Sequence, residues 1–106
     1  MKQADEYETD KVHAETMAWG GTTLRIIYKP NYLGLSDTAH IEVHVVEPQG
    51  APLPITDTGY RSHFLDAGVV EECGSASAYV QRWLDQEALS SAWKEACAQR
   101  RQLTLF

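Results

Sequence analysis

The stretch that decides the fold is Ala39-His40-Ile41-Glu42-Val43-His44-Val45-Val46-Glu47. Branched apolar residues alternate in it with polar ones, and a period of two predicts a strand with one buried face. Residues 22–30 repeat the pattern, because Leu24, Ile26 and Tyr28 alternate with polar neighbours before Pro30 ends the run. Two such strands joined by a short loop predict an antiparallel hairpin packed on a core.

Beyond this hairpin the pattern is irregular at first and then becomes helical. Residues 53–56 and 60–65 form a candidate third strand, interrupted at Thr58-Gly59. Ser75 suits the N-cap of a helix, and Ser90 or Ser91 either caps a second helix or marks a bend. The apolar residues recur at helical spacing, at Tyr79, Val80, Trp83 and Leu84 and then at Leu89, Trp93, Ala96 and Cys97. This order predicts an α+β fold, with an antiparallel β-hairpin or three-stranded sheet followed by C-terminal helices packed on one face.

The two ends of the chain differ from its centre. Residues 1–18 carry five acidic residues against two lysines and few large apolar side chains. We expect residues 1–18 to form an acidic, loosely packed arm, with a short helix possible over residues 10–17. Residues 19–101 then form a single α+β domain, and residues 102–106 form a C-terminal tail.

Composition narrows the classes of function. The 106 residues carry a net charge of -6, and the sequence pI is about 5.0, which argues against a general binder of duplex DNA. The negative charge is compatible with a protein that acts near DNA by binding another protein, or with an inhibitor that imitates DNA. Cys73 and Cys97 form no CxxC pair, so we expect reduced thiols in the cytoplasm. We also expect no membrane association, because no apolar run approaches the ~20 residues of a membrane span and the start lacks the features of a signal peptide.

His40, Glu42 and His44 share one face of the predicted strand, and imidazole and carboxylate groups are ordinary ligands of zinc or iron. His63 would complete a metal site if it lay beside them on a neighbouring strand. The alternative is the solvated outer face of a two-layer domain, where polar residues belong. We favour this alternative and expect no metal and no cofactor.

A polar cluster that spans the interruption of the predicted third strand is a second candidate, because functional sites often lie on loops. Its members are Thr56, Asp57, Thr58, Tyr60, Arg61 and His63. Binding is favoured over catalysis: Ser62 and His63 are adjacent, and adjacent strand residues face opposite ways, which suits no nucleophile and base. The alternative is a turn and an edge strand whose side chains satisfy local backbone. Residues 54–64 also resemble small uncharacterised proteins of bacterial mobile elements, a likeness that implies no activity.

The chain's last five residues are Gln102-Leu103-Thr104-Leu105-Phe106. They resemble the motif, commonly written QLxLF, by which bacterial polymerases and mismatch-repair proteins bind the DNA sliding clamp. The resemblance implies that Gln102 hydrogen-bonds at the pocket rim, that Leu103 fills a small site, and that Leu105 and Phe106 enter the main apolar pocket. The alternative is that these apolar residues fold back on the domain's own core.

We therefore predict a protein-interaction module, not an enzyme, that binds the bacterial sliding clamp and acts as an accessory or regulator of replication or repair. An acidic mimic of DNA that inhibits a nucleic-acid enzyme is the first alternative. A small metal-dependent enzyme using His40, Glu42, His44 and His63 is the second. The role of the folded body and the oligomeric state do not follow from the sequence.

Overall fold

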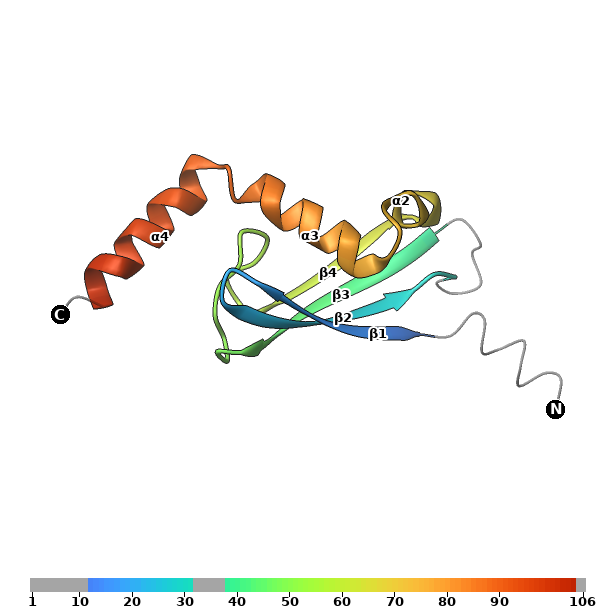
Figure 1. Cartoon of the computed structure of the whole chain (residues 1–106), viewed down its shortest axis with the longest axis horizontal. Helices are drawn as coiled ribbons and strands as arrows, with labels where there is room; N and C mark the ends of the chain where they lie inside the picture. The colour runs from blue at the N-terminus through green and yellow to red at the C-terminus, as the bar shows by residue number, and fades with distance from the viewer. Residues whose placement is uncertain (1–11, 32–37, 105–106) are drawn as a thin grey trace, which may run out of the picture.

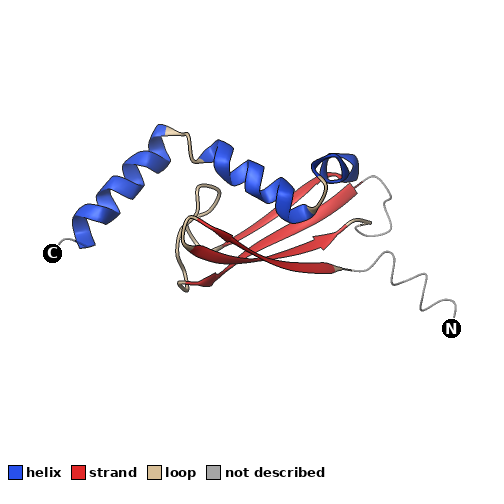
Figure 2. Cartoon of the chain, viewed as in Figure 1, coloured by secondary structure: helices blue, strands red, loops and turns tan. Residues whose placement is uncertain are grey.

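The computed structural model describes residues 12–31 and 38–104. Its four-stranded antiparallel sheet has the order β1-β2-β3-β4, and three helices follow it. Helices α2 and α3 cover one face of the sheet (Figures 1 and 2), so the predicted α+β class is confirmed. The elements are β1 (His13–Trp19), β2 (Thr22–Lys29), β3 (Thr38–Glu47), β4 (Tyr60–Asp66), α2 (Ala67–Cys73), α3 (Ala76–Glu87) and α4 (Ser91–Thr104).

Strands β2 and β3 form the predicted antiparallel hairpin, with Ile26 opposite Val43 and Leu24 opposite Val45. The candidate third strand is confirmed in its second half, which is β4. In its first half, Leu53 and Thr56 form only an isolated bridge, in which each backbone N–H donates to the other residue's carbonyl. Pro54 cannot donate a ladder hydrogen bond, so a turn rather than a strand forms there.

Strand β1 corrects the prediction of a loose arm and of a helix over residues 10–17. Residues 13–19 pair along their whole length with β2, ending at Trp19 opposite Thr22. Gly20 and Gly21 both have positive φ, 55° and 81°, which is the conformation of a two-residue hairpin turn. The Gly-Gly pair was therefore a turn within a hairpin rather than a boundary between an arm and a domain. Residues 1–11 lie outside the described residues.

The core lies between the sheet and the two helices that cover it. Its fully buried side chains come from β2, β3, α2 and α3. The largest are Leu24, Ile26, Ile41, Leu84, Val43, Val70 and Val80. All of the strand residues among them belong to the apolar half of the period-two pattern, so burial of that half drives the sheet against the helices.

Helix α3 begins where the sequence predicted: the Ser75 side chain accepts a hydrogen bond from the Ala78 N–H at 3.1 Å. Helix α2 was not predicted. Asp66 caps it by accepting from the Gly68 N–H at 2.8 Å, and Gly74 ends it at a φ of 100°. Only Val70 is buried in this short helix, so no apolar periodicity identifies it in the sequence.

Helix α4 follows the predicted Ser90 cap, whose hydroxyl accepts from the Trp93 N–H at 3.1 Å. Its first turn reaches the sheet, where the centroids of the Trp93 and Trp19 rings lie 6.3 Å apart, and the rest of the helix leads away (Figure 1). The predicted packing of the helices on one face therefore holds for α2 and α3 but not for most of α4. From Ser91 to Arg101, only Trp93 and Cys97 are partly shielded, and Leu89 before the helix is 65% exposed. A stripe of one tryptophan among alanines offers little area for docking on a core. No helix among the described residues is long and apolar enough to cross a membrane.

Candidate functional site

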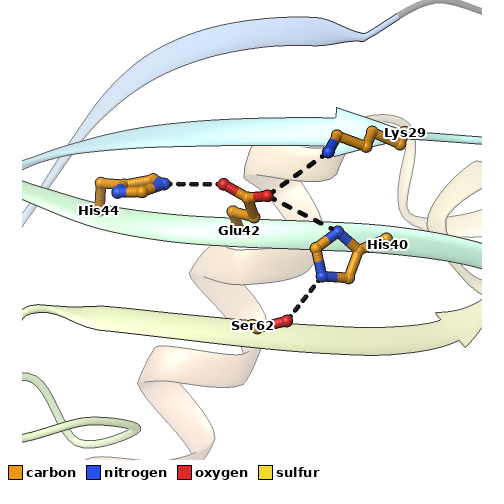
Figure 3. A network of polar contacts seen from close by, with 5 residues as sticks. All are labelled: Lys29, His40, Glu42, His44 and Ser62. Carbon is orange, nitrogen blue, oxygen red and sulfur yellow. Dashed lines mark hydrogen bonds and ion pairs between the residues drawn. The ribbon is translucent and has the colours of Figure 1, made fainter.

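The face of the sheet opposite the helices carries a polar network, shown in Figure 3. Glu42 lies at its centre: one carboxylate oxygen accepts from His44 Nε2 at 2.9 Å, and the other lies 3.5 Å from Lys29 Nζ. His40 is only 5% exposed, and its Nδ1 lies 3.9 Å from the same Glu42 oxygen that faces Lys29. The three β3 side chains share this face, as the period-two pattern predicted.

The electrostatics of the network follow from burial and pairing. The hydrogen bond from His44 lowers the pKa of Glu42 below its ordinary value, against the effect of burial, and Lys29 lowers it further. Burial lowers the pKa of His40, partly opposed by Glu42. At neutral pH the network therefore holds an ionised carboxylate beside a neutral imidazole.

His63 does not join His40 and His44. It lies on the neighbouring strand, opposite Ile41, whose side chain is in the core, so it faces the helices. There it contacts the Tyr79 hydroxyl at 3.1 Å and the Trp83 ring at a centroid distance of 4.3 Å. The four-residue metal site is therefore wrong in its geometry. Within residues 12–31 and 38–104 no group of three or more His, Cys, Asp or Glu residues is arranged to hold an ion.

Ser62 makes the contact that sequence reasoning missed. Its Oγ lies 2.6 Å from His40 Nε2 (Figure 3). Ser62 pairs with Glu42 across β3 and β4, and this register makes His40 its diagonal neighbour on the same face. In the sequence, Ser62 stands next to His63, which lies on the opposite face of the sheet. Only the strand register identifies the true partner.

The polar cluster between residues 56 and 63 is divided among three places. Thr56 and Thr58 serve the turn, because both hydroxyls donate to the Tyr60 carbonyl, at 2.8 and 3.3 Å. Tyr60 lies on the open face, where its ring contacts His44 at 4.9 Å. Arg61 lies on the helix side, where its guanidinium donates to the Ile55 carbonyl at 2.8 Å. Asp57 is exposed. The cluster is thus not one site, and its threonines fit the turn interpretation.

Helices α2 and α3 enclose a groove of about 350 Å³ on the side of the sheet that carries His63. The Tyr79 and Trp83 rings form its aromatic wall, and Arg82 contacts the Cys73 sulfur at 3.5 Å. The Arg61 guanidinium lies 5.3 Å from the centre of the Trp83 ring, a cation–π arrangement. The lining of the groove comes from α2 and α3, and α2 was not predicted, so no local sequence motif indicates the groove. The full lining is Val69, Glu72, Cys73, Tyr79, Arg82, Trp83 and Gln86.

The residues predicted to bind the clamp lie at the end of α4 or beyond it. The backbone of Gln102, Leu103 and Thr104 continues α4, whereas the tail was predicted to follow the helix. Arg, Gln and Leu are good helix formers, which accounts for the longer helix. Leu105 and Phe106 lie outside the described residues, so their predicted contacts stay a prediction. The acidic residues required by the DNA-mimic alternative are largely among residues 1–11, also outside the described part.

Comparison with known proteins finds a matching family model. The family model described as KlcB third domain matches residues 12–93, which run from the start of β1 into the first turn of α4. No curated protein and no solved structure matches the chain. The match spans the whole sheet with α2 and α3, and it includes the strand β1 that sequence reasoning had assigned to an arm. A KlcB domain is compatible with a plasmid-associated protein. Because the match covers well over half of its residues, the chain belongs to the KlcB third domain family.

Proposed function

We propose that this chain is a protein-interaction module of a plasmid-associated protein, and that it binds the bacterial sliding clamp through Gln102, Leu103, Leu105 and Phe106. The observation that carries the proposal is the match of these residues to the clamp-binding pattern at all four specified positions. The direction of α4, which leads away from the sheet (Figure 1), supports it. The alternative, a tail folded on the domain's own core, requires a chain reversal after Thr104.

Helix α4 suits the task of presenting a peptide. Its side chains from Ser91 to Arg101 are exposed except at Trp93 and Cys97, so the folded unit leaves this helix accessible. The family match ends at Trp93, so nearly all of α4 lies outside it. The last four carbonyls of a helix lack partners within the helix. The final turn, which includes Gln102 and Leu103, therefore rearranges at low cost when a partner binds.

The energy of the contact sets the expected affinity. Burial of Leu105 and Phe106 in an apolar pocket contributes roughly 3–6 kcal/mol. Ordering the segment offsets part of this gain. We expect a dissociation constant on the order of micromolar, about -8 kcal/mol, so the contacts of Gln102, Leu103 and the peptide backbone supply the rest of the binding free energy. Attachment to several subunits of a ring would tighten the binding through avidity. A copy held tightly would compete with polymerases, which use the same kind of peptide, whereas weak binding would tether the body to replicating DNA.

Calorimetry of the purified clamp against the full chain tests the proposal. Leu105→Ala/Phe106→Ala should weaken binding by about 100-fold, because it removes roughly 3 kcal/mol of burial. Leu89→Ala is the matched control, since Leu89 is an exposed leucine outside the motif, and it should bind like the wild type. Equal binding by the double variant and the wild type would show that the motif does not mediate binding, and absence of binding by the wild type would refute the clamp as the partner.

A further inference from the structure

The open face of the sheet holds an exposed serine in contact with a buried histidine. Ser62 Oγ lies 2.6 Å from His40 Nε2, a distance typical of a nucleophile that is hydrogen-bonded to its general base. Ser62 is exposed, and His40 is 5% exposed. An electrophile from solvent can therefore approach Ser62, whereas the His40 imidazole is fixed in position by the side chains that bury it.

The protonation state of His40 suits a base. Burial lowers its pKa, so the imidazole is neutral at pH 7. A neutral imidazole that accepts from the Ser62 hydroxyl at Nε2 carries its own proton on Nδ1. That nitrogen is buried, and Glu42 Oε2 lies 3.9 Å from it, beyond hydrogen-bond distance, so the carboxylate acts on the imidazole through its charge. The charges that act on the pKa of His40 are those of Glu42 on its own strand, which raises it, and Lys29 on β2, which lowers it. Burial lowers the pKa of His63 on β4, and His40 in turn lowers it further.

Glu42 supplies the third group. It is held from both sides, by His44 at 2.9 Å and by Lys29 at 3.5 Å, and its lowered pKa keeps it ionised at neutral pH. A carboxylate near Nδ1 stabilises the imidazolium that forms when His40 takes a proton. The order serine, histidine, carboxylate is the arrangement that activates a hydroxyl for attack.

We propose that Ser62 is a nucleophile activated by His40 and positioned by Glu42, and that it accepts acyl groups from small activated esters. In this step Ser62 Oγ bonds to the acyl carbon, and the Ser62 proton moves to His40 Nε2. The bond from the acyl carbon to the leaving alcohol breaks, and the alcohol departs with the electron pair and takes the proton from His40. Water then hydrolyses the Ser62 ester with His40 as base, which releases the carboxylic acid. This reactivity is independent of clamp binding.

A fluorophosphonate probe tests the proposal on the full chain, because it reacts with activated serines: the Oγ–P bond forms, the P–F bond breaks, and fluoride leaves. Mass mapping at pH 7 should show Ser62 labelled at least about tenfold faster than Ser91, an exposed serine at the start of α4. Ser62→Ala should abolish this label, and Ser91→Ala should leave it unchanged. His40→Gln should reduce it to the rate of Ser91, and Glu42→Gln should reduce it severalfold.

The pH profile of the wild type keeps the proposal testable if His40→Gln does not fold. The Ser62 labelling rate should be flat above pH 7 and fall in acid with a midpoint below 6.5, the ordinary pKa of histidine, because protonated His40 cannot accept a proton. An unassisted serine would instead react faster as pH rises, without a plateau. Labelling of Ser62 no faster than Ser91, or a rate without this plateau, would overturn the proposal.

Discussion

Leu84→Ala tests the packing of α3 on the sheet, on which the groove and the position of Trp83 depend. Leu84 is 0% exposed and belongs to the core cluster. Truncating a buried leucine to alanine costs about 2–5 kcal/mol, because apolar burial is lost and a cavity remains. Domains of this size have unfolding free energies of roughly 5–15 kcal/mol. A loss of about 3 kcal/mol should lower the melting temperature by about 12–24 °C.

Equilibrium unfolding in urea, followed by tryptophan fluorescence and circular dichroism, measures this loss. Leu89→Ala is the matched control: the same atoms are removed, but Leu89 is 65% exposed, so the change should stay within about 0.5 kcal/mol. The denaturant slope of Leu84→Ala should match the wild type if only packing is lost. A cost below about 1 kcal/mol for Leu84→Ala, or equal costs for the two variants, would refute the docking of α3 described above.

Four further predictions follow from the same structure and sequence. Deletion of residues 1–18 should abolish cooperative unfolding because it removes β1 up to Ala18, whereas deletion of residues 1–11 should preserve it. Circular dichroism melts of both deletion variants test this, and cooperative unfolding of the chain that lacks residues 1–18 would contradict it. The unfolding free energy should fall as pH is lowered from 7 to 5. Burial lowers the pKa of His40 and of His63 below the ordinary value, so the unfolded chain binds more protons than the folded chain in this window. Urea titrations at three pH values measure the trend, and an unfolding free energy that does not change with pH would count against it. Duplex DNA should bind only weakly in fluorescence anisotropy, since 9 Lys and Arg face 15 Asp and Glu, and tight, steeply salt-dependent binding would show the opposite. Elemental analysis of purified protein should find no stoichiometric zinc or iron, and one equivalent lost on His44→Ala would prove that expectation wrong.

Local patterns in the sequence determined several elements of this protein. The period-two alternation around Ile26 and Val43 depends only on which side chains enter a core, so it predicted β2, β3 and their pairing. The Ser75 cap depends on one hydroxyl and a backbone N–H three residues away, and it too was correct. The Gly20-Gly21 turn was equally local, but the acidic composition before it outweighed the hairpin signal, and β1 was missed.

The tertiary structure alone decided which side chains meet. The register of β4 against β3 placed Ser62 beside His40 and turned His63 to the opposite face, towards Tyr79 and Trp83. A shift of one residue would have exchanged these two outcomes, because neighbouring strand residues face opposite ways. That register depends on the turns between residues 47 and 60 and on the packing of α3, which contacts with distant parts of the chain determine. The sequence therefore specified β2, β3 and the helix cap, whereas cross-strand packing specified the site.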